Sequence, residues 1–114
     1  MADCLFCKML TGAIKPDVVY ENEHVLAFRD INPQAPVHVL IIPKKHIATI
    51  NDLSDDDTLL AGDLFIATKA VATLTGIADS GYRTVMNCNA DAGQSVFHIH
   101  LHVLGGRHLA WPPG

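Results

Sequence analysis

The stretch "SVFHIHLHVLGG", residues 95–106, alternates histidines with apolar residues. Its histidines are spaced by two, and successive side chains of a β-strand point to opposite faces of a sheet. We therefore expect residues 97–104 to form a strand that carries His98, His100 and His102 on one face. The intervening side chains should then point into the core; these are Phe97, Ile99, Leu101 and Val103.

Four further segments have the composition of strands. Residues 18–22 and 24–30 are β-rich runs separated by a turn, which predicts a hairpin. Residues 37–43 form a mostly apolar run whose extension is limited by its final proline, and residues 82–88 form another β-rich run. With residues 97–104 these segments predict an antiparallel sheet of about five strands.

Two segments have helical signals. Residues 5–12 predict a short helix that ends at Gly12, and residues 54–76 predict a long one. Ser54 suits the N-cap of the long helix and Gly76 can close it. Sheet and helices together predict an α+β domain. One face of the long helix should pack on the sheet through apolar residues spaced by four and three: Leu60, Leu64, Ala67, Val71 and Leu74.

Length and charge limit the protein class. The chain has 114 residues, 49% of them hydrophobic, which fits one compact domain over residues 1–114, and pairing with a second copy would supplement its modest core. The formal charge is −4, with no basic run beyond Lys44–Lys45, so we do not expect nucleic acid as a partner. The absence of a membrane-length apolar stretch and of a signal-peptide pattern predicts a cytoplasmic protein without membrane contacts.

The alternating histidines have three possible explanations. They form a solvated strand face, they ligate a catalytic zinc ion, or they act on phosphorus. The preceding loop favours phosphorus, because Gly93 permits backbone conformations that turn N–H groups toward an anion, and Ser95 adds a hydroxyl. Neighbouring imidazoles near their titration range would neutralise charge or move a proton.

These motifs resemble those of histidine triad (HIT) proteins. "HIHLHVL" matches the HφHφHφφ signature, in which φ is apolar, while "DINPQAPVHVLIIPKKH", "AGQSVFHIHLHVLGGR" and "WPPG" are similar to the Hint branch. The resemblance extends from about Leu5 to Gly114. It implies a sheet continued across a homodimer. It also implies hydrolysis of purine nucleoside phosphoramidates, such as AMP-NH2 or AMP–amine conjugates, through a nucleotidyl-histidine intermediate.

The resemblance assigns a role to each histidine of the triad. His100 would be the nucleophile, with its other ring nitrogen bonded to a backbone carbonyl, and His102 would contact the phosphate oxygens. His98 is the first histidine of the signature, and His38 joins the triad as a fourth histidine. In the loop, Ser95 would bond the leaving nitrogen, and the N–H groups of Gln94 and Ser95 would face the phosphate.

Nucleotide-binding residues follow from the same resemblance. Asp30 would hold the ribose hydroxyls, Asn87 would lie near ribose and phosphate, and Trp111 would lie near an active site, its own or a partner subunit's. An apolar base pocket should discriminate weakly between adenine and guanine, so AMP and GMP are both expected ligands. The residues matching this pocket are Leu5, Phe6, Met9, Phe28, Ile31 and Leu40.

A second motif, Cys4-x-x-Cys7, has more than one explanation. Its spacing suits a tetrahedral metal that needs two more ligands, but two thiols on one helix face could also simply pack. Redox chemistry is disfavoured because no strand precedes the motif. By resemblance, His46 and His98 complete a structural zinc site, and no catalytic cofactor is expected. Zinc would fix the wall of the base pocket, so metal loss should weaken nucleotide binding before it affects chemistry.

Two other functions remain open. One is a dinucleoside polyphosphate hydrolase of the related fragile-histidine-triad branch. The other is a nucleotide-sensing or protein-interaction module in which hydrolysis is incidental. The "WPPG" end and the "AGQSVFHIHLHVLGG" stretch favour the Hint branch over the first of these.

Overall fold

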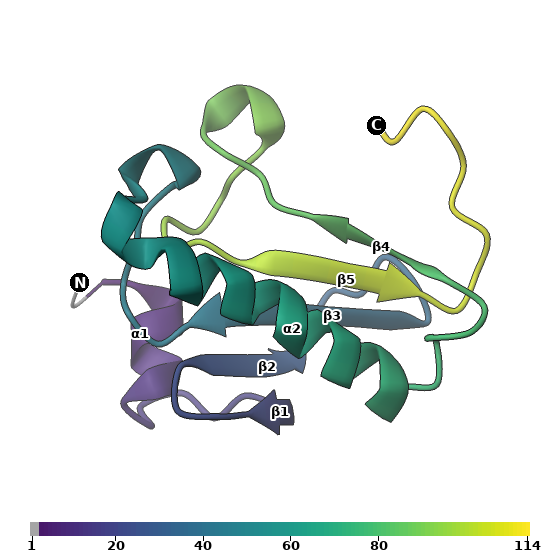
Figure 1. Ribbon diagram of the computed structural model, residues 1–114, viewed down its shortest axis with the longest axis horizontal. Coiled ribbons are helices and arrows are strands. Elements are labelled where there is room, and N and C mark those ends of the chain that lie inside the picture. Colours follow the sequence, from purple (N-terminus) through teal and green to yellow (C-terminus); the bar gives the residue numbers. More distant parts are fainter. Residues whose placement is uncertain (1–2) are drawn as a thin grey trace.

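The computed structural model describes residues 3–114, and its centre is one antiparallel sheet of five strands in the order β1-β2-β3-β5-β4 (Figure 1). All the strands predicted from the sequence are present. A long helix, α2 (Thr58–Leu74), crosses one face of the sheet, and a short helix, α1 (Leu5–Leu10), precedes the first strand. The strands are β1 (Val18–Glu21), β2 (Val25–Arg29), β3 (Val37–Pro43), β4 (Tyr82–Val85) and β5 (Leu101–Gly105).

The final strand is shorter than the alternation predicts. It begins at Leu101 instead of residue 97, and the register that pairs Ile41 with Leu101 would place Ile99 opposite Pro43. Proline has no N–H for the ladder, so the pairing stops there and the Ile99 N–H donates to the Ile47 carbonyl at 2.8 Å instead. The prediction that Phe97 lies in the core is also wrong, because its side chain is 49% exposed.

Helix α2 begins later than predicted. Ser54 caps a 3-10 turn over Asp55–Asp57, in which the Ser54 N–H donates to the Asp57 carboxylate at 3.0 Å, and the α-helix begins at Thr58. The C-terminal signal is confirmed: Gly76 has φ +77°, which favours glycine.

The packed face of α2 differs from the prediction at one residue. Leu64, Ala67 and Val71 are buried and Leu60 packs against them, but Leu74 is 62% exposed. Thr68 and Ala72 are buried as well. The packed face is therefore rotated toward these two small residues, which leaves Leu74 at its rim in the last turn.

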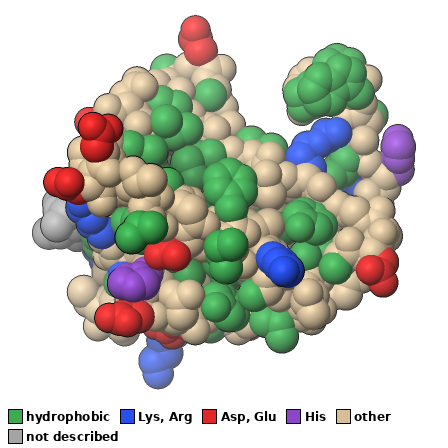
Figure 2. Space-filling view, viewed as in Figure 1, with side chains coloured by type: hydrophobic (Ala, Val, Ile, Leu, Met, Phe, Trp, Pro, Cys, Tyr) green, Lys and Arg blue, Asp and Glu red, His purple; other side chains and the backbone are tan. Residues whose placement is uncertain are grey.

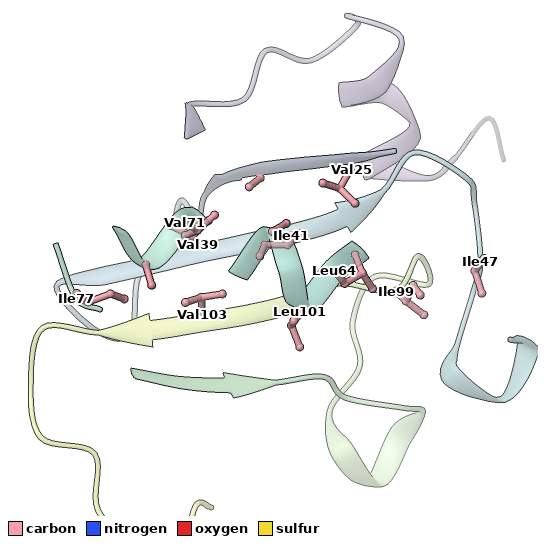
Figure 3. Packing of buried hydrophobic residues seen from close by; sticks show 13 residues of the cluster. Val25, Val39, Ile41, Ile47, Leu64, Val71, Ile77, Ile99, Leu101 and Val103 are labelled. Carbon is pink, nitrogen blue, oxygen red and sulfur yellow. The ribbon is translucent and has the colours of Figure 1, made fainter. Parts of the chain in front are cut away.

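The sheet is covered on both faces. On the α2 side the buried residues Val39, Ile41, Leu101 and Val103 pack under the helix (Figure 3). On the other side Phe6 of α1 packs with the alternate residues of β2 and β3, which are Leu26, Phe28, Leu40 and Ile42. Burying one large apolar side chain contributes about 1.5–3 kcal/mol, so both clusters contribute to holding the strands in register.

Apolar side chains are also exposed on the outer face of α2, among them Leu59, Phe65 and Ile66. Figure 2 shows green side chains spread over this face of the molecule. The tail after β5 leaves the sheet and extends past β4 (Figure 1). Within residues 3–114, no helix has the length and apolar character needed to cross a membrane.

Candidate active site

The histidines gather on the face of the sheet opposite α2. His38 comes from β3 and His102 from β5, and their facing nitrogens, Nε2 and Nδ1, lie 2.9 Å apart. The His100 ring centre is 5.0 Å from that of His102. Asp30, which directly follows β2, places Oδ2 3.4 Å from His38 Nε2. The fold thus brings to the histidines a carboxylate that lies far from "HIHLH" in the sequence.

A backbone carbonyl sets the tautomer of His100. The Nδ1–H of its buried ring donates to the His98 carbonyl at 2.8 Å, so the lone pair is on Nε2. The Phe6 ring meets the His100 ring edge-on with centroids 5.1 Å apart. His100 therefore offers a fixed, desolvated nucleophilic nitrogen beside an apolar wall.

A second chain of hydrogen bonds sets the tautomers of His38 and His102. The Gln34 N–H donates to His38 Nδ1 at 3.0 Å, so the proton of the neutral His38 ring is on Nε2. That proton faces His102 Nδ1 at 2.9 Å, which must accept it. The remaining nitrogen of His102, Nε2, therefore carries an N–H that can donate to an anion.

Burial keeps these imidazoles neutral near pH 7. It lowers the pKa of His38, His98 and His100, and it lowers that of His102 to about 4, with His100 and His38 contributing to the last shift. At pH 7 the His102 ring is therefore far from its titration range, contrary to the expectation from sequence, and the pKa values of the other three rings are shifted in the same direction. They act through directed lone pairs and N–H groups.

The cysteine pair meets two histidines at the N-terminal end of α1. Cys4 is the N-cap of α1, and its sulfur accepts from the Cys7 N–H at 3.3 Å. One ligand atom from each of Cys4, Cys7, His46 and His98 lies within 4.8 Å of the others. His98 Nε2–H donates to the Pro43 carbonyl at 2.8 Å, which leaves the Nδ1 lone pair directed at the sulfurs.

These four atoms fit a tetrahedral zinc ion. The Cys4 Sγ–His98 Nδ1 and Cys7 Sγ–His46 Nδ1 distances are 3.4 and 3.3 Å, and the two Nδ1 atoms are 3.1 Å apart. Zn–S and Zn–N bonds of about 2.3 and 2.0 Å in a tetrahedron require about 3.5 Å between sulfur and nitrogen and about 3.3 Å between two nitrogens, and the observed distances lie within about 0.2 Å of these. The predicted ligand set is thus brought together at suitable spacing, and no further carboxylate is needed.

A second group of possible ligands does not fit a metal as well. Asp30, His38 and His102 each offer an atom within 4.8 Å of the others. However, the Gln34 N–H occupies His38 Nδ1, so His38 Nε2 carries a proton and has no lone pair for a metal. The group is better described as a hydrogen-bonded relay.

The loop before the histidines is held by Gln94. Its buried side chain accepts from the Asn89 N–H at 2.9 Å and donates to the Ala48 carbonyl at 2.8 Å. Its own backbone N–H donates to the Asn89 carbonyl at 3.1 Å. This N–H is therefore not free to face a phosphate, contrary to the prediction. Gly93 has φ +81°, consistent with its expected role in the turn, and Ser95 is exposed beside it.

The residues expected to bind the nucleotide are only partly assembled. Phe6, Phe28 and Leu40 form one buried cluster with Met9 packed against it. By contrast, Ile31 is 97% exposed and Trp111 is 80% exposed, with the Trp111 ring over Arg83 at 6.0 Å. Leu5 is exposed and Asn87 is half-buried.

Three residues of the site were not predicted from the sequence. Gln34 and Pro43 contact the histidines through backbone atoms, and Arg107 reaches the Gln34 carbonyl. Backbone N–H and C=O groups are present at nearly every residue, so no residue-type signal identifies them. Only the spacing of four between Gln34 and His38, in a loop with two prolines, could have indicated such a contact.

The antiparallel fold and the four neighbouring histidines define the histidine triad class of protein. This chain belongs to the HIT family: the HIT domain model matches residues 11–109. An uncharacterized HIT-like protein from Synechococcus elongatus is 48% identical over 112 residues, which cover 98% of this chain and 97% of that protein.

Solved structures agree with this assignment. The crystal structure of a HIT family hydrolase from Legionella pneumophila superposes with a TM-score of 0.95 at 57% identity, covering 98% of this chain and 100% of that one. A histidine triad nucleotide-binding protein from Candida albicans superposes with a TM-score of 0.81 at 31% identity, covering 96% and 83%.

Proposed function

We propose that this protein hydrolyses the P–N bond of purine nucleoside phosphoramidates, such as AMP-NH2 and AMP–amine conjugates. The observation that carries the proposal is the His100 imidazole, whose Nδ1–H is tied to the His98 carbonyl so that the Nε2 lone pair is available. The names of the Legionella hydrolase and the Candida nucleotide-binding protein support hydrolysis and nucleotide binding.

The reaction would proceed in two displacements. His100 Nε2 attacks the α-phosphorus, the P–N bond breaks, and the amine leaves with a proton taken from solvent, which the exposed Ser95 hydroxyl would relay. Water then attacks the nucleotidyl-histidine, which releases AMP and restores the imidazole. The His102 Nε2–H donates to the phosphoryl oxygens as their charge changes.

Nucleotide binding would use the apolar cluster and Asp30. We assign the base to the wall formed by Phe6, Phe28 and Leu40, close to His100, and the ribose hydroxyls to the Asp30 carboxylate. An exposed Ile31 beside Asp30 would close over the base. An apolar wall has few polar atoms with which to distinguish AMP from GMP, so both are proposed ligands.

Assembly and metal content form part of the proposal. We propose a two-fold homodimer in which the sheet continues across the edge strand β4, supported by the exposed Leu59, Phe65 and Ile66 on α2. We also propose structural zinc at the Cys4–Cys7–His46–His98 cluster, where it would cross-link the chain, with no catalytic cofactor. Residues 1–114 would form one HIT domain, of which the structure describes residues 3–114. The cysteines form no disulfide among the described residues, which suits the proposed location in the cytoplasm.

The first prediction tests the nucleophile. His100→Asn should lower kcat for an AMP–amine conjugate at least about a thousandfold while AMP still binds, because the attacking lone pair is lost. Mass spectrometry of the quenched wild-type reaction should show AMP attached to His100. His24→Asn, in the exposed hairpin turn, is the matched control and should keep full activity.

The same assay separates the alternative functions. Cleavage of diadenosine polyphosphate in preference to the conjugate would favour the polyphosphate hydrolase. If the wild type binds AMP but cleaves neither substrate, the protein is a nucleotide-binding module. Full activity of His100→Asn would show that the nucleophile is wrongly assigned.

A further inference from the structure

Arg107 is the starting point of a hydrogen-bonded chain that ends in the candidate active site. Its Nε and Nη2 atoms donate to the Gln34 carbonyl at 3.3 and 2.9 Å, and its Nη1 donates to the His108 carbonyl at 3.0 Å. The guanidinium therefore joins the loop before β3 to the segment after β5. A planar guanidinium that places two N–H groups on one oxygen restrains both the position and the direction of that carbonyl.

The turn after β5 is shaped to bring Arg107 to this loop. Gly106 has φ +89°, and a Cβ at this position would lie 3.0 Å from Pro36 Cβ. A side chain here would thus force the turn away from the loop. Gly106 therefore allows the close approach that lets Arg107 span to Gln34.

The loop itself has few other restraints on the Gln34 backbone. Pro33 and Pro36 lack N–H groups, and the Gln34 side chain donates to the nearby Asn32 carbonyl at 3.1 Å. Besides that bond, the described hydrogen bonds at Gln34 are the long-range bond from Arg107 to its carbonyl and the bond from its N–H to His38, four residues later. Gln34 is thus held at both ends of one residue.

The position of the Gln34 N–H decides what His102 presents to a ligand. While it donates to His38 Nδ1, His38 Nε2–H faces His102 Nδ1, and His102 Nε2 carries a proton. If the Gln34 N–H moved away, His38 could take the other tautomer. Its Nε2 lone pair would then face His102 Nδ1 at 2.9 Å, so His102 would have to protonate Nδ1 and present the lone pair of its Nε2 to an anion.

We propose that Arg107 is a positioning residue, which holds Gln34 through its carbonyl so that the Gln34 N–H fixes the His38 tautomer and makes His102 a hydrogen-bond donor to phosphate. The inference rests on the proposed function for its catalytic consequence, but the tautomer itself is a property of the free protein. Arg107 does not touch the substrate in this scheme.

The second prediction tests this series of hydrogen bonds from Arg107 to His102. Histidine ring ¹⁵N NMR of the purified protein distinguishes protonated from unprotonated ring nitrogens. The wild type should show His38 protonated on Nε2 alone, and Arg107→Ala should show a mixture of tautomers at His38 and His102. With AMP-NH2, kcat should fall roughly tenfold to a hundredfold, and KM should change much less, because the lost donor acts on charge that develops during reaction.

Two other variants complete the experiment. Arg107→Lys keeps one charged donor and should restore part of the wild-type tautomer and of kcat. Arg29→Ala removes an exposed arginine whose ion-pair partner within residues 3–114 is the Asp17 carboxylate at 3.7 Å, and it should match the wild type in both measurements. Thermal unfolding establishes that each variant is folded, and Arg107→Lys provides the test if Arg107→Ala is not.

The outcomes separate this inference from the proposed function. If Arg107→Ala keeps a single His38 tautomer and an unchanged kcat, Arg107 has no positioning role. If the tautomers change as expected but the wild type cleaves no phosphoramidate, the chain from Arg107 to His102 stands and the proposed function fails.

Discussion

Backbone groups, more than side chains, define the chemistry of each histidine in this site. The His98 carbonyl holds His100, the Pro43 carbonyl holds His98, and the Gln34 N–H holds His38. A backbone partner does not titrate and has no side-chain rotamers, so each ring keeps one tautomer as long as that backbone is held in place. Burial adds to this by disfavouring the charged imidazolium, which is why these rings are neutral near pH 7.

The third prediction concerns the stability of this arrangement against acid. The pKa of His102 is about 4 in the folded protein, whereas the ordinary value of 6.5 holds after unfolding. Between these values the unfolded chain binds more protons than the folded one. The stabilising contribution of the neutral His102 ring is therefore fully present above about pH 6.5 and is lost as pH drops toward about 4. His102 alone should account for about 2 kcal/mol between pH 7.5 and pH 5.

Urea unfolding at these two pH values measures the loss. His102→Asn should lose about 2 kcal/mol less than the wild type over the same interval, because it has no imidazole to protonate. His24→Gln changes an exposed histidine and should keep the wild-type difference. Equal pH dependence in His102→Asn and the wild type would contradict the buried, neutral state of His102.

At the scale of elements, strand β5 depends on its closing glycine. Gly105 pairs with Val37 of β3 and lies directly against Ile77, the buried residue that follows α2. A Cβ at Gly105 would lie 2.8 Å from Ile77 Cδ1 and 3.1 Å from Ile77 Cβ. The absence of a side chain therefore lets the end of α2 pack on the end of β5.

The fourth prediction follows from this contact. Gly105→Ala should lower the free energy of unfolding by about 1–3 kcal/mol, since the strand and the buried isoleucine must move apart. Ile77→Val removes the nearest methyl group, so the double variant should be less destabilised than the sum of the two single variants. Chemical denaturation of all four proteins measures the coupling, and strict additivity would show that the contact is not limiting.

At the scale of the whole molecule, the cysteine–histidine cluster joins three distant segments. Cys4 and Cys7 lie at α1, His46 follows β3, and His98 precedes β5. His98 also contributes the carbonyl that holds His100. The cluster and the proposed nucleophile are therefore linked through one residue, which couples the N-terminal segment to His100 more directly than a pocket wall would.

The fifth prediction tests this coupling. Metal analysis of untreated wild type should give about one zinc per chain, and Cys4→Ser should lose it and unfold at lower temperature. Because His98 serves both sites, Cys4→Ser should lower kcat for AMP-NH2 as well as weaken AMP binding, which revises the expectation that binding fails first. Cys88→Ser, a half-buried cysteine outside the cluster, is the control.

Two results would contradict it. Zinc well below one per chain in the untreated wild type would show that the cluster is not a zinc site. Full kcat in a zinc-free Cys4→Ser protein would show that the His98 carbonyl keeps its position without the metal.

The sequence by itself determined the local elements and the chemical class of the site. Apolar periodicity, Gly12 and Gly76 predicted the helices and strands to within a few residues of their observed ends. These signals are local, since each acts between residues near one another in the sequence. The spacing of His98, His100 and His102 indicated a histidine site, and Cys4 and Cys7 indicated a ligand pair.

Only the tertiary structure decided how those residues are used. Pro43, paired opposite the expected start of the last strand, ended the ladder at Leu101 and turned His98 toward the cysteines. The pairing of β2 with β3 also brought Asp30 to His38, and the loop before β3 brought the Gln34 N–H to the same ring. The physical reason is that tautomers and strand ends depend on backbone groups from distant segments, and these groups are chemically the same at almost every residue of the chain.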